Sequence, residues 1–146
     1  MRVQRFLASA LLATAAFTPA QAAMYCVSNA TQLNNALNEA GTNGQADDVR
    51  MMPGVYTRSP DVAGDNMFKH ILENGRNFSL SGGWNAGCTS QSRLDPAATV
   101  IDGQLTHKLL YIGNGASVSG DVQLRNFTLQ RGFTQAIDGL FELRVT

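Results

Sequence analysis

The spacing of apolar residues changes near residue 48 and divides the chain after its leader into two parts. Between residues 31 and 41, four apolar residues recur with the i, i+3, i+4, i+7 spacing of one helical face: Leu33, Ala36, Leu37 and Ala40. Thr31 is the candidate N-cap and Gly41 the candidate glycine after the last turn. The pattern predicts a short amphipathic helix that follows a β-prone segment, residues 24–27.

After residue 48 the helical period disappears, and short β-type runs recur between Gly, Asn, Asp and Pro. The runs cover residues 49–52, 55–57, 70–72, 78–81, 99–101, 109–112 and 122–129. Several are followed by glycines that lie 28, 21 and 29 residues apart: Gly54, Gly82, Gly103 and Gly132. An irregular period of this length indicates stacked coils.

The clearest run, residues 122–129, alternates apolar and polar side chains but slips by one position at Arg125-Asn126. This slip is expected if Asn126 turns a corner between two short strands whose apolar sides both face inward. A β-sandwich would also give short strands with frequent turns, so periodicity alone leaves that architecture open.

The N-terminus has the three parts of a secretory signal peptide. Residues 1–5 are positively charged, residues 6–17 are apolar or small, and Ala20-Gln21-Ala22 forms a small-x-small cleavage site. About 12 apolar residues cover only some 18 Å as a helix, too little for a hydrocarbon core of about 30 Å. We therefore expect removal of residues 1–22 and a secreted product (extracellular, periplasmic or cell-surface) without a transmembrane segment. The Ala-rich leader is typical of bacteria.

Composition excludes some function classes. The chain of 146 residues is 44% hydrophobic and 15% charged, with 11 basic and 11 acidic side chains. This composition argues against disorder. Because no basic patch is present to hold phosphates, we expect no nucleic-acid partner.

Export also affects the interpretation of the two cysteines, Cys26 and Cys88. In an oxidising compartment a disulfide is favoured over a metal site, and two cysteines allow one pairing. Neither cysteine belongs to a C-x-x-C pair, and His70 and His107 lack metal-ligand spacing. We predict a Cys26–Cys88 disulfide and no metal site.

Several segments, in this order, resemble the N-terminal part of secreted right-handed parallel β-helix proteins of the pectate-lyase-like superfamily. This superfamily includes polymorphic-outer-membrane-protein-like and autotransporter-like members, which the chain also resembles. The resemblance covers roughly residues 26 to 133. The segments are TQLNNALNEA (31–40), DDVRMMPGVYT (47–57), LSGGW (80–84), Cys88, RLDP (93–96), TVIDG (99–103) and FTLQRG (127–132).

The resemblance implies a mainly β solenoid with a strand-helix cap over residues 23–48 and coils over residues 49–146. A cap is required physically because a stack of coils exposes backbone edges at its ends. Residues 141–146 are apolar-rich and contain no capping helix. We therefore expect a piece of a longer protein, truncated after about three to four coils, that can self-associate through its open C-terminal coil.

In pectate-lyase-like enzymes, acidic residues bind calcium and a basic residue removes a proton. The candidates here are Asp95, Asp102, Asp121, Arg93, Lys108, Arg125 and Arg131. They match no family motif, and Asp95 and Asp102 stand in turn settings before Pro and Gly. Asp47-Asp48 is interpreted as the turn after the cap rather than a metal pair, and both histidines as surface or coil-edge residues. No catalytic residue, metal ligand or cofactor is therefore assigned.

These observations favour a non-catalytic β-helix protein or fragment whose faces bind carbohydrate or a cell-surface protein. Trp84 is the candidate carbohydrate contact, although a tryptophan beside two glycines more often packs on the core or cap. Two alternatives stay open. The chain is the N-terminal piece of a polysaccharide lyase or glycoside hydrolase with catalytic coils beyond residue 146, or an inactive truncated gene product.

The leader generates the first testable prediction. Signal peptidase is expected to cleave after Ala22, because Ala20 and Ala22 supply the two small side chains of the site. Intact-mass measurement of the exported protein checks this. A product that still contains residues 6–17 would contradict export through this leader.

Overall fold

The computed structural model describes residues 22–57, 67–72, 75–114, 120–132 and 141–143. The predicted signal peptide lies almost wholly outside this part, so its cleavage stays a prediction. No helix among the described residues is long and apolar enough to cross a membrane.

The described residues form short strands, one α-helix and one 3-10 helix, so the expectation of a mainly β chain is confirmed. The elements in chain order are β1 (Ala23–Val27), α1 (Ala30–Thr42), β2 (Asp47–Met51), β3 (Gly54–Thr57), β4 (Phe68–Leu72), β5 (Phe78–Ser81), η1 (Pro96–Ala98), β6 (Thr99–Asp102), β7 (Leu110–Asn114), β8 (Val122–Arg125), β9 (Thr128–Gln130) and β10 (Phe141–Leu143).

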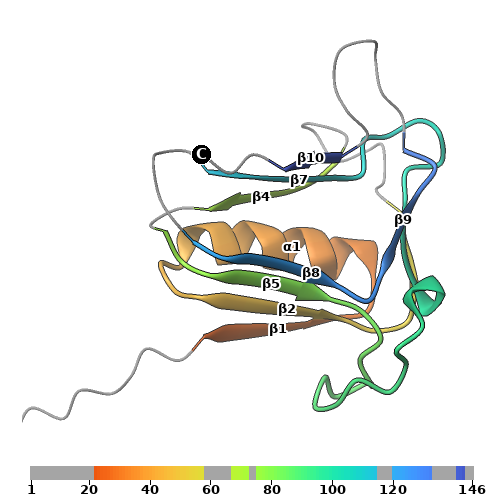
Figure 1. Cartoon of the computed structure of the whole chain (residues 1–146), viewed down its shortest axis with the longest axis horizontal. Helices are drawn as coiled ribbons and strands as arrows, with labels where there is room; N and C mark the ends of the chain where they lie inside the picture. The colour runs from red at the N-terminus through yellow and green to blue at the C-terminus, as the bar shows by residue number, and fades with distance from the viewer. Residues whose placement is uncertain (1–21, 58–66, 73–74, 115–119, 133–140, 144–146) are drawn as a thin grey trace, which may run out of the picture.

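The strands form three sheets, in the orders β1-β2-β5-β8, β3-β6-β9 and β10-β7-β4. These are called the first, second and third sheet. From β2 onward the chain visits the first, second and third sheet in turn, and it repeats this circuit from β5 and from β8 (Figure 1). Every strand pair within the three sheets is parallel. The antiparallel sheets of a β-sandwich are therefore absent from the described residues.

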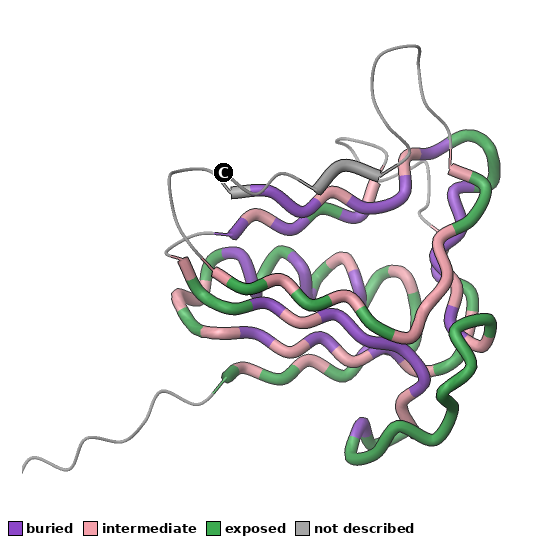
Figure 2. Tube along the Cα trace, viewed as in Figure 1, coloured by how far each residue is buried: buried purple, intermediate pink, exposed green. Residues whose placement is uncertain are grey.

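The parallel register stacks equivalent residues on top of one another and builds the core. In the first sheet Val49 pairs with Leu80, which pairs with Leu124. In the second sheet Tyr56 pairs with Ile101. Figure 2 shows buried positions alternating with more exposed ones along several strands, as expected when one face of each sheet packs inward.

Helix α1 lies over the first strand of each sheet and contacts β4 most extensively. Its buried side includes the predicted residues Leu33, Ala36, Leu37 and Ala40. Together with β1, which extends the first sheet beyond β2, the helix covers one end of the strand stack.

The predicted ends of this helix were wrong. Asn29, and not Thr31, is the N-cap, because its side-chain oxygen accepts the Gln32 N–H at 2.9 Å. Gly41 lies inside the helix and does not end it. A Cβ at this position would come within 3.0 Å of the Ile71 carbonyl oxygen, so glycine permits close approach to β4.

Both histidines are buried, so the expectation of surface or coil-edge positions was wrong. His107 is buried after β6. His70 on β4 is 2% exposed, and its Nδ1 lies 3.0 Å from the Leu37 carbonyl oxygen of α1. Because a carbonyl only accepts, Nδ1 carries the proton that joins the helix to the third sheet. The ring also stacks on Phe78, with centroids 3.9 Å apart. Burial lowers the pKa of His70, so the neutral ring is the form that packs here.

His70 predicts a specific pH dependence of stability. As the pH falls below about 6.5 the unfolded chain binds a proton at this histidine before the folded chain does, so the free energy of unfolding decreases. The variant His70→Phe keeps a stacking ring but does not titrate, and it should lose less stability between pH 7.5 and 5.5 than the wild type. Urea denaturation at both pH values measures this difference. Equal losses in the two proteins would contradict the assignment.

Candidate functional site

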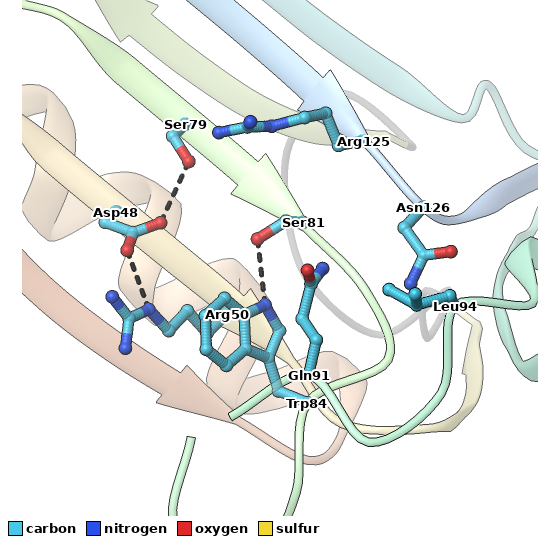
Figure 3. A pocket seen from close by; sticks show the side chains of 9 residues that line it. All are labelled: Asp48, Arg50, Ser79, Ser81, Trp84, Gln91, Leu94, Arg125 and Asn126. Atoms are coloured by element: carbon cyan, nitrogen blue, oxygen red, sulfur yellow. Dashed lines mark hydrogen bonds and ion pairs between the residues drawn. The ribbon is translucent and has the colours of Figure 1, made fainter. Parts of the chain in front are cut away.

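The candidate site is a groove of about 480 Å³ on the outer face of the first sheet. We call it the sheet groove, and Figure 3 shows its side chains. The described residues that line it are Asp48, Arg50, Ser79, Ser81, Trp84, Gln91, Leu94, Arg125 and Asn126. The strand residues among them come from β2, β5 and β8, and the others from the loop after β5 and the corner after β8.

Register places the polar side chains of the sheet groove next to one another. Asp48 pairs with Ser79, and Arg50 pairs with Ser81, which pairs with Arg125. They alternate with the core residues along their strands, although Ser81 at the end of β5 is itself buried. Each row is therefore fixed by the same stacking as the core. Residues more than 70 positions apart in the chain therefore form one surface.

A loop over residues 82–94 forms the wall of the sheet groove, and glycine allows the chain to enter it. Gly83 has φ +81°, and a Cβ there would lie 1.8 Å from the Arg93 carbonyl oxygen. The Gly83 carbonyl oxygen instead accepts the N–H groups of Ser92 and Arg93 at 2.8 and 3.0 Å. The two ends of the loop are thus held against each other by main-chain contacts.

Asn126 joins this loop to the neighbouring strand. It has φ 57° between β8 and β9, which confirms the predicted corner. Its amide nitrogen donates to the carbonyl oxygens of Gly82 and Arg93, at 2.9 and 2.8 Å. Asparagine suits this position because it tolerates left-handed backbone and supplies a donor.

The predicted Cys26–Cys88 disulfide is present, and it ties the loop to β1. Cys88 is buried, and its carbonyl oxygen accepts a hydrogen bond from Arg50 Nη1 at 2.7 Å. Arg50 is the register partner of Cys26, so the crosslink and the guanidinium hold the same part of the loop.

Most of the charge on Arg50 is compensated within the sheet groove. Its Nε lies 2.7 Å from Asp48 Oδ2, and Asp48 Oδ1 accepts a hydrogen bond from Ser79 Oγ at 2.8 Å. The guanidinium carbon also lies 4.2 Å from the centre of the Trp84 ring, a cation–π contact. Asp48 therefore interacts with two groups, Arg50 and Ser79. Arg50 interacts with three: the Asp48 carboxylate, the Trp84 ring and the Cys88 carbonyl oxygen.

Arg125 is the cationic side chain left available in the sheet groove. It is exposed, and its guanidinium has no hydrogen-bond or ion-pair partner among the residues that the structure describes. Figure 3 shows it reaching from β8 across β5 toward Ser79. Since the lining residues include two guanidinium groups and one carboxylate, the sheet groove presents a positive charge to a ligand.

Trp84, the candidate sugar contact, lies in this wall. Its Nε1 donates to Ser81 Oγ at 2.9 Å, and Arg50 covers one face of the indole. Leu94 adds an apolar surface that is 76% exposed. Sequence reasoning named Trp84 and Arg125 but missed the serines and Arg50, for which alternation in the predicted strands 49–52 and 78–81 was the available signal.

The acidic and basic candidates from the sequence do not form one cluster. Asp95 caps η1 by accepting the Ala97 N–H, the turn role expected for it. Asp121 is exposed before β8, and Lys108 lies between β6 and β7. Arg125 lies in the sheet groove, whereas Arg93 is exposed at the end of the loop and does not line the groove.

Asp102 and Arg131 do meet, in a structural ion pair away from the sheet groove. The buried Asp102 carboxylate accepts hydrogen bonds from the Arg131 guanidinium and from Gln104 N–H at 2.8 Å. The Arg131 contact is the main cause that lowers the pKa of Asp102 to about 2, with smaller help from Gln104 and Gln130. This carboxylate is therefore ionised at neutral pH, and it holds Arg131 at the corner after β9.

The interpretation of Asp47-Asp48 as a turn was wrong, because both residues begin β2. Asp47 is buried, burial raises its pKa, and Asn43 Nδ2 donates to it at 2.6 Å. Asp48 faces the sheet groove instead. Within the described ranges, no three His, Cys, Asp or Glu residues are placed to hold a metal ion.

No family model, curated protein or solved structure matches this chain. The interpretation of the sheet groove therefore depends on its own geometry.

The disulfide generates a prediction about stability and about the groove wall. Replacing both cysteines by serine should lower the free energy of unfolding by roughly 4 kcal/mol, because the crosslink closes a loop of about 62 residues. Denaturant unfolding compares the double variant with the wild type. Hydrogen exchange should accelerate most in residues 84–92. A uniform increase across all three sheets would show that the crosslink does not act on the wall.

Proposed function

We propose that this chain is a secreted protein with a right-handed parallel β-helix fold, and that its sheet groove binds a saccharide. Three parallel sheets visited in a fixed order support the fold, as does a strand-helix cap over one end. The Cys26–Cys88 disulfide is consistent with an oxidising compartment.

The observation that carries the proposed activity is the combination of groups in the sheet groove. Saccharides present hydroxyl groups around apolar ring faces, so they require hydrogen-bonding side chains beside apolar surface. Ser79 and Gln91 supply hydroxyl and amide groups, whereas Trp84 and Leu94 supply apolar surface.

The exposed guanidinium of Arg125 favours a saccharide that carries a carboxylate or a sulfate. Such a group would form charge-assisted hydrogen bonds without displacing an existing protein partner. Binding is favoured over bond cleavage because Asp48, the carboxylate that lines the sheet groove, is already engaged by Arg50 and Ser79.

Arg125→Ala tests this proposal. Loss of a charge-assisted hydrogen bond should weaken binding of a carboxylated oligosaccharide by at least about tenfold. The neutral counterpart, with each carboxylate reduced to an alcohol, should bind the variant and the wild type almost equally. The single tryptophan of the chain, Trp84, provides an intrinsic fluorescence signal for titration.

Arg76→Ala is the matched control, because Arg76 is exposed and lies outside the sheet groove. It removes the same charge and should leave the affinity unchanged. Equal weakening by both substitutions would indicate nonspecific charge attraction, and no binding by the wild type would remove the saccharide proposal.

A further inference from the structure

Strand β1 has an edge that no other described strand covers. It is the outermost strand of the first sheet, and β2 is its one pairing partner among the described residues (Figure 1). Ala23 N–H donates to the Ala46 carbonyl oxygen at 2.8 Å, and the Val27 carbonyl oxygen accepts from Met52 N–H at 2.9 Å. Because alternate residues of a parallel strand face the same neighbour, the main-chain groups of Met24 and Cys26 point away from β2.

This edge lacks the features with which proteins usually block strand addition. β1 has the sequence AMYCV, without charge or proline, and all five residues stay in register with β2. Met24 is 51% exposed, and Cys26 is also exposed. No described residue hydrogen-bonds to the outward main-chain groups of either residue.

A second groove runs along β1 and has a volume of about 320 Å³. We call it the edge groove. Its described lining residues are Met24–Val27 of β1 and Gln32, Asn35, Ala36 and Glu39 of α1. Glu39 is the charged member of this set, is exposed, and forms no ion pair with any residue in the described ranges.

We propose that the edge groove is a docking site for an extended polypeptide segment that carries a lysine or arginine. The segment adds as a further strand beside β1, using the outward N–H and C=O groups of Met24 and Cys26. Its cationic side chain pairs with Glu39 on the helix side of the groove. Main-chain hydrogen bonds supply most of the affinity, and the charge supplies selectivity. This site is separate from the sheet groove, so it does not depend on saccharide binding.

The experiment uses the exported, disulfide-bonded protein and a fluorescent heptapeptide, Val-Thr-Val-Lys-Val-Thr-Val, with both ends blocked. Fluorescence anisotropy should show saturable binding at micromolar to millimolar concentration. Exchanging the peptide lysine for glutamate should weaken binding, as should Glu39→Gln in the protein. We expect about two- to fivefold for Glu39→Gln, the range of an exposed ion pair.

Met24→Pro tests the strand edge directly. Proline removes an N–H that faces away from β2, so pairing within the sheet is retained while peptide binding falls by at least about threefold. Met24→Ala is the matched control, because it removes the same side chain but keeps the N–H, and it should bind like the wild type. Thermal unfolding of Met24→Pro verifies that the fold is intact. A peptide methylated on alternate backbone nitrogens should not bind.

Three outcomes would overturn the proposal. The first is no saturable binding of the lysine peptide at millimolar concentration. The second is equal affinity for Met24→Pro and Met24→Ala. The third is a dimer in analytical ultracentrifugation that Met24→Pro dissociates, because the occupant of the edge would then be a second copy of this chain.

Discussion

Parallel, in-register stacking of short strands is the constraint on which the rest of this structure depends. Because each circuit places its strands directly beside those of the preceding circuit, inward residues stack in rows that build the core, such as Val49, Leu80 and Leu124. A slip of one residue would turn each such row outward. The corners therefore have to be fixed. At one of them the side-chain amide of Asn126 donates to the Gly82 carbonyl oxygen, and the Gly82 N–H donates to the Arg125 carbonyl oxygen.

The same stacking generates the sheet groove as a consequence of the core. When the inward residues align, the residues between them also align, so register alone places Arg50, Ser81 and Arg125 in one row. Arg50 is then compensated by Asp48, whereas Arg125 at the far end of the row is not. Of these two similar cations, Arg125 is therefore the one without a compensating partner among the described residues.

Local patterns predicted most of the elements, but not β10 or η1 and not the neighbours of each side chain. The spacing of apolar residues, with periods of 3.6 and 2, predicted the helix, most of the strands and the Asn126 corner. The expected export predicted the disulfide. His70 was misplaced because its burial depends on α1 and β4 lying together, about 30 residues apart in sequence. The serines and Arg50 were missed because only the register between strands brings these residues beside Trp84. The N-cap was missed because Asn29 and Thr31 are both acceptable caps, and the spacing of apolar residues does not choose between them.

The clamp formed by Asn126 and Gly83 has a consequence for variation among proteins of this kind. Since the Gly82 and Arg93 ends of the loop are fixed to each other, the residues between them form a closed excursion from the sheet. Lengthening such an excursion costs little, because loop-closure entropy grows only logarithmically with length. Provided that Cys88 is kept, loops of other lengths and sequences can replace this one, and the wall of the sheet groove can change without any change in the strands beneath it.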